Sequence, residues 1–411
     1  MGKPMCNKIK NKKMTKIKLK YVLCLLTGLF LLICCKEDAS EEHDIIVFNK
    51  KNITNIDRIE YYNLDFIDSS VFVPLETSFQ SILGEISQLE YFEGRFYIND
   101  NQTKKLKVFD ESGKYLFDIG KQGRGPGEYV SIRTFFINST DRKICIIDPS
   151  SSAIHEFSLE GVFLQTKRFG SFGIGSATKA KYANGRIFFN KPVDFTQNMA
   201  YFFVSAEDYS ITEWLRPYPV KPDYDMYATL MDHPFSIFDN TFYYVSLFSD
   251  TIYMYDNDRE IPYLYVETGK PNIPPSYLEA NSIKNEPTAA LVHVWRDDRY
   301  SEGFTEIAVT SRFILTSFKF DFLPFYLLDK KTNEGYLVNT GLAPNLGIPS
   351  FVENNRLIKV WTPDHIEAYM HQIESGAVTP TESVKSLLKS YDPEFHNPIL
   401  IVYYLKGLDD E

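Results

Sequence analysis

The sequence lacks an apolar run long enough to cross a membrane. The longest such run, YVLCLLTGLFLLICC (Tyr21–Cys35), has 15 residues, whereas a membrane-spanning helix needs about 20. Short enzyme motifs are missing too. The absence of Gly-x-Ser-x-Gly excludes an α/β-hydrolase, and none of the seven histidines forms a His-Glu-x-x-His motif or another close metal-binding pair. The sequence therefore predicts no metal, no cofactor and no identifiable catalytic residue.

The N-terminus has the order of a secretory signal. Residues 1–20 contain eight lysines and no acidic residue, and the short apolar run follows them. That run ends in Leu-Ile-Cys-Cys, which resembles a bacterial lipobox. The resemblance implies that residues 1–34 are a signal peptide and that Cys35 is the lipidated first residue of the mature protein. Cys34 is the alternative, although Ile33 would then occupy the position of the small residue.

An acidic segment, KEDASEEHD, follows the lipidated cysteine. A lysine and two acids directly after that cysteine resemble the surface-export signal of Bacteroidetes lipoproteins. The alternative is an ordinary charged tether without an export role. Together these features predict a tether over residues 35–43 and a protein that is lipid-anchored in the outer membrane and exposed on the cell surface.

Removal of the signal peptide makes the chain strongly acidic. The formal net charge moves from −10 to −18, because eight lysines leave and no acid does. Such a protein repels nucleic acid phosphates, so nucleic acid is not expected as a partner. Of the five cysteines, only Cys145 then remains beside the lipidated one, so no disulfide can form and a large apolar core must stabilise the fold.

Two internal repeats indicate the architecture. The segments that begin at Ile98 and Ile146 share Asp, Phe and Gly at one offset of 48 residues, without a gap. The segments YFEGRFYIN (from Tyr91) and YANGRIFFN (from Tyr182) share Tyr, Gly, Arg and Asn at an offset of 91. Alternating apolar residues around Asp-Glu-Ser-Gly predict a β-hairpin. Each unit of about 45 residues therefore has the size of one propeller blade.

The spacing predicts an all-β, six-bladed β-propeller over residues 44–411. Because open sheet edges are costly, we expect the early strand SVFVPLE (Ser70–Glu76) to complete the last blade beside NPILIVYYLK (Asn397–Lys406). Helical spacing between Thr362 and Tyr391 predicts a small helical insertion in that blade.

The order of these segments resembles a known family. FVPLET, LGEI, FYIND, VFDESGKYLFDIGKQGRGPGEY, SDTIYMY and NPILIVYYLK occur in this order. They are similar to segments of the six-bladed propeller lipoproteins of Bacteroides and its relatives, which are in turn similar to NHL-repeat propellers. The resemblance implies architecture and location more than chemistry, since most of that family has no demonstrated activity.

The glycine-rich stretch GKQGRGPGEY (Gly120–Tyr129) is the first candidate ligand loop. It does not match a phosphate-binding loop, because no Lys-Ser/Thr follows the glycines and the next segment has a β pattern. We interpret it as a crossing between blades, where glycine supplies positive φ and proline stiffens a turn. The alternative is a loop in which Arg124 and glycine N–H groups bind an anion or a sugar.

The stretch HVWRDDRY (His293–Tyr300) is the second candidate. Its Trp295, Arg296, Asp297 and Asp298 are suited to sugar recognition, with the ring stacking on the sugar and the charged groups binding hydroxyls. The alternative is a loop whose arginines and aspartates pair with one another.

These observations predict a non-catalytic protein, with the lipid anchor as its contact to the membrane. We expect it to bind an extracellular glycan or a partner protein of a nutrient-uptake system. The alternative is a propeller lyase or hydrolase whose site lies at the central channel, since a catalytic set assembled from separate blades has no sequence motif.

Overall fold

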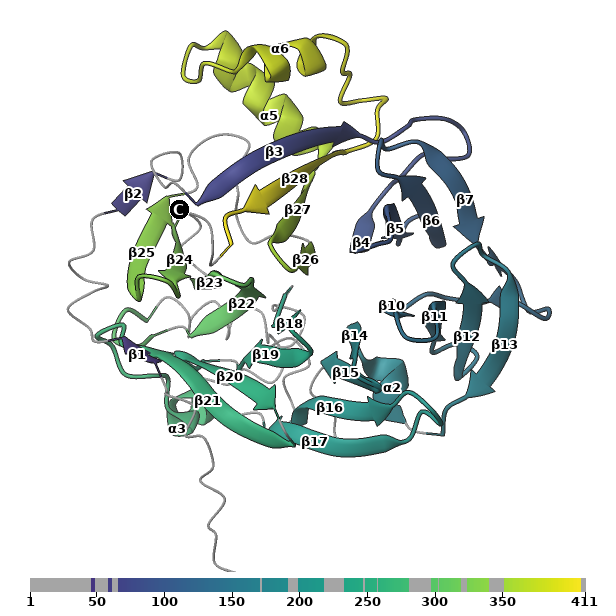
Figure 1. The fold of residues 1–411 in the computed structure, drawn as a ribbon, viewed down its shortest axis with the longest axis horizontal. Helices are drawn as coiled ribbons and strands as arrows, with labels where there is room; N and C mark the ends of the chain where they lie inside the picture. Colours follow the sequence, from purple (N-terminus) through teal and green to yellow (C-terminus); the bar gives the residue numbers. More distant parts are fainter. Residues whose placement is uncertain are drawn as a thin grey trace, which may run out of the picture. The chain divides into compact units, whose positions relative to one another are not determined.

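Six β-sheets stand around a central channel in the computed structural model of the chain (Figure 1). The structure describes residues 46–48, 58–60, 66–170, 172–190, 199–217, 233–246, 248–256, 258–280, 297–301, 303–318, 324–339 and 351–407. All six sheets belong to one compact unit, residues 45–411. The predicted all-β, six-bladed propeller is confirmed.

Each of the first three blades is a four-stranded antiparallel meander that runs from the channel outward. Blade 1 comprises β4 (Ile86–Phe92), β5 (Arg95–Asp100), β6 (Lys105–Asp110) and β7 (Tyr115–Ile119). Blade 2 comprises β10 (Thr134–Asn138), β11 (Lys143–Asp148), β12 (Ala153–Ser158) and β13 (Phe163–Arg168). Blade 3 comprises β14 (Lys179–Ala183), β15 (Arg186–Asn190), β16 (Met199–Ser205) and β17 (Ile211–Pro217).

Blades 4 and 5 have the same order of four strands, and blade 6 takes its outer strand from the N-terminal part of the chain. Blade 4 comprises β18 (Phe235–Phe238), β19 (Thr241–Val245), β20 (Thr251–Asp256) and β21 (Arg259–Val266). Blade 5 comprises β22 (Phe304–Val309), β23 (Phe313–Phe318), β24 (Pro324–Asp329) and β25 (Glu334–Asn339). Blade 6 comprises β26 (Phe351–Glu353), β27 (Arg356–Trp361), β28 (Ile399–Leu405) and β3 (Ile67–Pro74).

The ring closes in blade 6, as the sequence predicts. The N-terminal strand β3 pairs antiparallel with the C-terminal strand β28, and Val73 lies opposite Leu400. The pairing joins residues more than 300 positions apart in the sequence. It completes the last blade, so the ring has only the short edges that each blade keeps at the channel and at the outside.

Two short N-terminal strands extend the outer edges of neighbouring blades. Strand β1 (Ile46–Phe48) pairs parallel with β21 of blade 4, and β2 (Arg58–Glu60) pairs parallel with β25 of blade 5. The chain then becomes the outer strand of blade 6 (Figure 1). The three N-terminal strands therefore lie at the outer edges of three successive blades, and the sequence did not predict β1 and β2.

The two faces of the ring differ in their connections. On one face, every connection within a blade is a turn of two to five residues. The innermost hairpin of blade 1 turns at Glu93–Gly94 and that of blade 3 at Asn184–Gly185, with positive φ at all four residues, as a two-residue type I′ turn requires. These two turns account for the 91-residue repeat.

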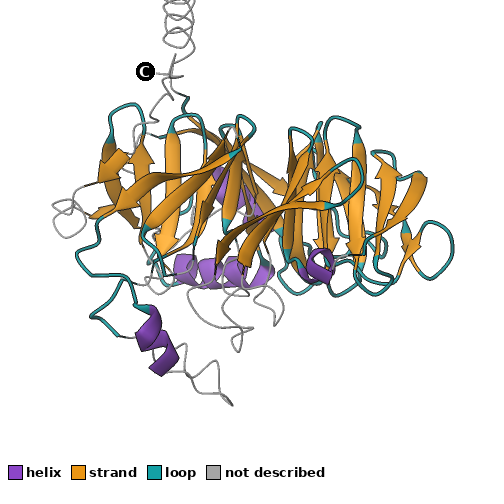
Figure 2. Cartoon of the chain, turned by 90° about the horizontal axis from the view of Figure 1, so that it is seen from below, coloured by secondary structure: helices purple, strands orange, loops and turns teal. Residues whose placement is uncertain are grey.

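The opposite face carries the long connections. The described helices all lie in connections of this kind: α2 (Phe172–Ser176), α3 (Pro275–Ala280), α5 (Pro363–Glu374) and α6 (Glu382–Lys389). The predicted helical insertion is α5 and α6, between β27 and β28. Figure 2 shows the ring from its side, with the sheets standing next to one another. We call the face with the short turns the turn face and the face with the long connections the loop face.

Buried aspartates explain the 48-residue repeat. Asp100 and Asp148 end the second strands of blades 1 and 2, and both are fully buried. Asp148 accepts hydrogen bonds from the N–H groups of Val130 (2.8 Å) and Ser131 (3.2 Å), in the chain that enters its blade. Asp100 accepts equivalent bonds from the residues before β4. Each carboxylate thus satisfies the backbone donors of a crossing between blades.

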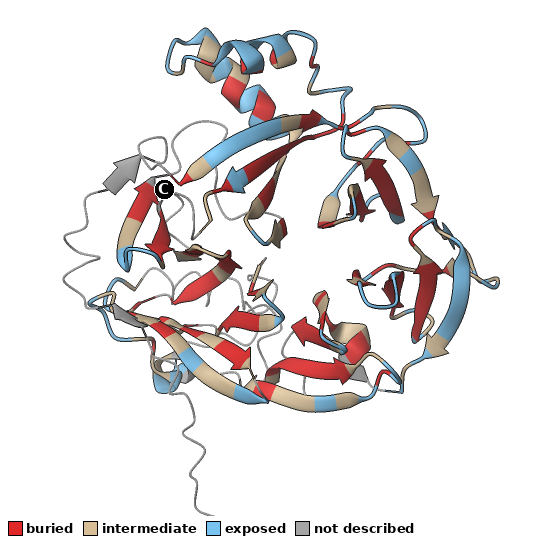
Figure 3. Ribbon diagram, in the orientation of Figure 1, coloured by how far each residue is buried: buried red, intermediate tan, exposed pale blue. Residues whose placement is uncertain are grey.

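Aromatic side chains pack neighbouring blades together. Figure 3 shows that buried residues make up much of the strands within the blades. Phe188 on β15 is fully buried, and its ring centroid lies 5.2 Å from Tyr201 in the same blade and 5.1 Å from Phe235 in the next. Such ring pairs stabilise a core beyond the area that they bury. The sequence has 59 Phe and Tyr residues, and many of those that the structure describes are buried in this radial packing.

Candidate functional site

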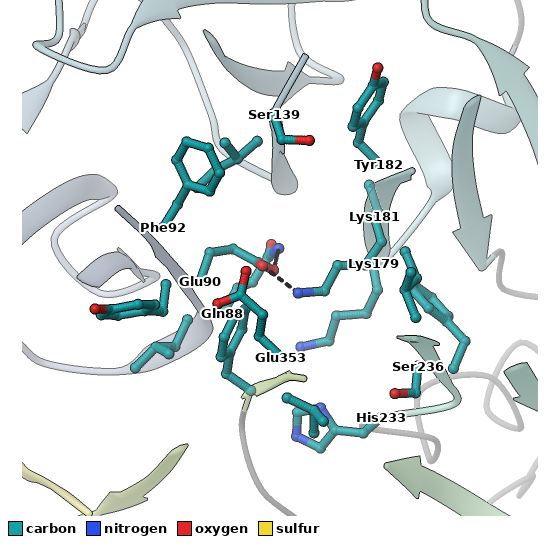
Figure 4. Close-up of a pocket in the computed structure, with 18 of the residues that line it drawn as sticks. Gln88, Glu90, Phe92, Ser139, Lys179, Lys181, Tyr182, His233, Ser236 and Glu353 are labelled. Carbon is teal, nitrogen blue, oxygen red and sulfur yellow. Dashed lines mark hydrogen bonds and ion pairs between the residues drawn. The ribbon is translucent and has the colours of Figure 1, made fainter. Parts of the chain in front are cut away.

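A cavity of about 390 Å³ lies at the axis of the ring, and the innermost strand of every blade contributes to its wall (Figure 4). Ser139, Asp239, Asn240 and Asn354 belong to turns of the turn face and also line it. The cavity therefore extends from that face into the channel. Its polar and charged lining residues farther in are Gln88, Glu90, Lys179, Lys181, His233, Ser236 and Glu353.

A hydrogen-bonded network fixes the wall formed by blades 1 and 2. Gln88 Nε2 donates to Glu90 Oε1 (3.0 Å) and to the carbonyl oxygen of Phe135 (2.7 Å). Thr134 Oγ1 donates to Gln88 Oε1 (2.8 Å). Gln88 and Glu90 are two residues apart on β4, so alternation along the strand places both on the channel side.

Strand β14 of blade 3 provides two lysines. Lys181 forms an ion pair with Glu90, and its Nζ lies 4.5 Å from the centroid of the Phe351 ring. Lys179 Nζ donates to the carbonyl oxygen of Ser87 (3.0 Å). The ion pair and the hydrogen bond join blade 3 to blade 1 across the channel, and Figure 4 shows both lysine side chains reaching into the cavity.

Two further titratable side chains face the cavity. Removal from solvent, together with the positive charges of Lys179 and Lys181, lowers the pKa of His233 to about 3, so the imidazole is neutral at physiological pH. Removal from solvent raises the pKa of Glu353, against the opposing effects of Arg356 and Lys181. Neither the imidazole nor this carboxyl group has a hydrogen-bond or ion-pair partner among the residues that the structure describes.

The arrangement combines donors, acceptors and aromatic rings at one place. Lysine ammonium groups can donate to oxygen atoms, and glutamate carboxylates can accept from hydroxyl groups. Tyr91, Phe92, Tyr182, Phe235 and Phe351 supply apolar surface in the same wall. Binding sites for small molecules typically combine apolar walls with a few convergent polar groups in about 300–1,000 Å³.

A family model described as "Domain of unknown function (DUF4934)" matches residues 10–404. The chain belongs to the DUF4934 family. No curated protein matches it.

Solved structures from Bacteroides resemble the fold of this DUF4934 chain. A protein from Bacteroides fragilis NCTC 9343, described as a candidate exported protein, has a TM-score of 0.66 at 16% identity and covers 89% of this chain and 100% of its own. A member of the duf4221 family from Bacteroides vulgatus ATCC 8482 has a TM-score of 0.49 at 13% identity, with 83% and 98% covered. The first likeness shows a shared fold; the NHL-like part of the resemblance remains a prediction.

The glycine-rich loop lies away from the cavity. It connects β7 of blade 1 to β10 of blade 2, and the short strands β8 (Lys121–Gln122) and β9 (Glu128–Tyr129) pair within it. Glu128 holds the loop together, because it accepts from the N–H of Gly125 (2.8 Å) and pairs with Lys121 (2.8 Å). Arg124 is exposed on the loop and does not line the cavity.

The second predicted site is described only in part. Trp295 and Arg296 lie outside the described residues, as does Cys35. Asp297 and Asp298 precede blade 5, and neither lines the cavity. Asp297 accepts from Arg299 Nε (2.8 Å) and also pairs with Tyr277, and both partners hold the pKa of its carboxyl group well below the usual range. This pairing within the loop is the arrangement that the alternative interpretation expected.

The 91-residue repeat in the DUF4934 sequence also indicates which residues line the channel, although we interpreted the repeat only as evidence for the fold. At the 91-residue offset of the repeat, Gln88 corresponds to Lys179 and Glu90 to Lys181. A repeat that keeps its turn and strand residues but changes charge at two alternate positions is typical of a surface with a role other than packing. Nothing in the sequence shows that His233 and Glu353 reach the same place.

Within the described ranges, no helix is long and apolar enough to cross a membrane, and no group of three or more His, Cys, Asp or Glu residues could hold a metal ion.

Proposed function

We propose that this protein is an outer-membrane lipoprotein that binds an extracellular glycan in its central channel without acting on it chemically. The anchor is the lipid on Cys35, and the ring is exposed on the cell surface. A lipobox-like N-terminus supports the anchor. The candidate exported protein from Bacteroides fragilis, which shares the fold, is consistent with export.

The cavity at the ring axis is the observation that carries this proposal. It has about 390 Å³ and opens among short turns, with ammonium groups, carboxylates and aromatic rings in its wall. Sugars present apolar ring faces and many hydroxyl groups, so they need this combination of stacking surfaces, donors and acceptors. A partner protein of a nutrient-uptake system remains the other candidate ligand, and it would bind a wide face instead of the cavity.

A panel of neutral and acidic oligosaccharides tests the proposal. The full chain in detergent is heated with each sugar, since a ligand that binds only the folded state raises the melting temperature. We expect one class of sugar to raise it, and the Glu353→Gln variant to weaken that effect. A panel in which no oligosaccharide changes the melting temperature contradicts the proposal.

A lyase or hydrolase is the second candidate, and two side chains without a partner in the described part of the chain favour it. The raised pKa of Glu353 favours a carboxyl group able to donate a proton. The neutral imidazole of His233 lies in the same cavity, although its pKa of about 3 makes it a weak base. Incubation of the sugars that bind, followed by chromatography, separates the candidates. Shortened or unsaturated products that disappear with His233→Gln would support the enzyme.

The residues that the sequence predicted as ligand-binding remain proposals for a second contact. Arg124, Trp295, Arg296, Asp297 and Asp298 would hold parts of a longer glycan outside the channel. Replacement of Arg124 by alanine tests this: a loss of affinity for long but not for short oligosaccharides would support it, and unchanged affinity for both would leave the loop with a structural role only.

A further inference from the structure

We infer that the channel ligand carries a carboxylate, as a uronic acid residue does, and that Lys179 and His233 hold this group while Glu353 accepts a hydroxyl. The inference rests on the proposed function, because it names the class of glycan that the same cavity takes. Three sides of the cavity carry it.

The first side is the lysine strand. Lys179 and Lys181 alternate on β14 and point toward the cavity in Figure 4. The ion pair with Glu90 and the contact with the Phe351 ring fix Lys181. The 3.0 Å hydrogen bond to the carbonyl oxygen of Ser87 positions the ammonium group of Lys179 at the wall. Two ammonium groups are thus held in place before any ligand arrives, which reduces the entropy cost of binding.

The second side is His233, just before β18. Removal from solvent lowers the pKa of its ring most, and Lys179 and Lys181, the charged groups that face the ring, lower it further. Glu90 and Glu353, with Asp239 at the rim, complete the titratable groups of the cavity wall. A positive potential therefore acts on the imidazole, and a ligand carboxylate placed between Lys179 and the ring would reduce it. The carboxylate would thus raise the pKa of the ring, and the ring N–H can donate to it.

The third side is Glu353 on β26. Its carboxyl group faces the same cavity without a partner in the described parts of the chain. An ionised carboxylate there repels the acidic group of a ligand and accepts from its hydroxyl groups, so it sets the orientation of the sugar. Together with Glu90 it also disfavours ligands of higher negative charge, such as phosphate or sulfate esters, because like charges at short range repel.

Calorimetry on the unmodified full chain tests the inference without relying on variants. The probes are short oligosaccharides of galacturonate, glucuronate and mannuronate, each compared with its methyl ester, which keeps the sugar but removes the charge. We expect one acid to bind at least tenfold more tightly than its ester, because a tenfold change corresponds to about 1.4 kcal/mol and one charge-assisted hydrogen bond can supply this difference.

Matched variants locate the effect. Lys179→Met and His233→Gln should each weaken binding of the acid about tenfold or more and leave binding of the ester nearly unchanged. Lys385→Met is the control, because Lys385 is an exposed lysine of α6 that pairs with Glu382 and does not line the cavity. Acid and ester affected equally by Lys179→Met would overturn the assignment of that lysine to the carboxylate.

The outcomes separate the inference from the proposed function. Equal affinity for acid and ester, or tight binding of neutral oligosaccharides alone, overturns the inference and leaves the glycan-binding function standing. Binding of no sugar at all overturns both. In the favourable case, the pKa of His233 measured by NMR should rise when the acid is added and stay constant when the ester is added.

Discussion

At the scale of single residues, buried carboxylates at the ends of strands make the stability of the fold depend on pH. Asp148 is fully buried, and its donors include Val130 N–H and the Ser131 and Ser151 hydroxyl groups. Burial opposes its ionisation, but His155 and these donors together hold the pKa below the usual range. Its ionised form therefore stabilises the fold above the unfolded pKa, near 4, and this stabilisation is lost as the pH falls toward the folded pKa.

Asp148→Asn should lower the free energy of unfolding by about 1–3 kcal/mol at pH 7, because donors in the blade crossing lose their acceptor. The difference from the unmodified protein should shrink at pH 3. Urea denaturation at the two pH values measures it, with the exposed Asp68→Asn as control. A variant as stable as the parent at pH 7 would contradict the role given to this carboxylate.

Asp250 should behave in the opposite way. It is fully buried, and burial raises its pKa to about 6, although Ser301 and Thr268 donate to it. Because the folded pKa lies above the unfolded value, the fold loses stability as the pH rises from about 4 to about 6. Asp250→Asn removes this penalty, so we expect it to be more stable than the parent by about 1–3 kcal/mol at pH 8 and similar at pH 4. Lower stability of the variant at pH 8 would contradict the expectation.

At the scale of elements, the N-terminal strands differ in importance. Strand β3 closes the ring by a seven-residue pairing with β28, whereas β1 and β2 each pair over three residues at the outside of a complete sheet. Deletion of residues 45–60 should lower the melting temperature by several degrees and keep one cooperative transition. Deletion of residues 66–74 should abolish that transition, because blade 6 loses its outer strand. Circular dichroism during heating compares the two, and equal effects would contradict the closure.

The sequence predicted the elements that have local signals. Alternating apolar residues and Gly-containing turns gave the blades, and Thr caps at Thr362 and Thr381 accompany the predicted helices. Strands β1 and β2 were not predicted. A parallel strand of three residues needs only a sheet edge to pair with, and it is too short to show an alternation of apolar and polar residues in the sequence. The channel residues were missed for a related reason: His233, Lys179 and Glu353 meet through closure of the ring, and no local spacing encodes that meeting.

At the scale of the whole molecule, the proposed attachment to the membrane depends on one residue. If Cys35 carries the lipid, Cys35→Ser should abolish labelling by radioactive palmitate and release the protein from the membrane fraction. Cys34→Ser is the matched control and should keep both properties. Loss of the label with Cys34→Ser alone would assign the lipid to Cys34.

The two faces of the ring differ, and this difference indicates from which side a ligand enters the channel. The cavity reaches the turn face, where short turns hold its mouth rigidly, and the loop face carries the helices. A ligand that binds in the channel from the turn face should therefore be blocked by a large side chain at the mouth and be insensitive to one at the periphery of the same face.

Affinity of a glycan for a protein with a plugged channel tests this most directly. Ser139 is exposed in the turn after β10 and lines the mouth, and Ser112 is exposed in the outer turn after β6 and does not. We expect Ser139→Trp to weaken binding at least tenfold, and Ser112→Trp to leave it unchanged, with both melting temperatures close to that of the parent. Unchanged affinity of a folded Ser139→Trp protein would contradict the assignment of the ligand to the channel.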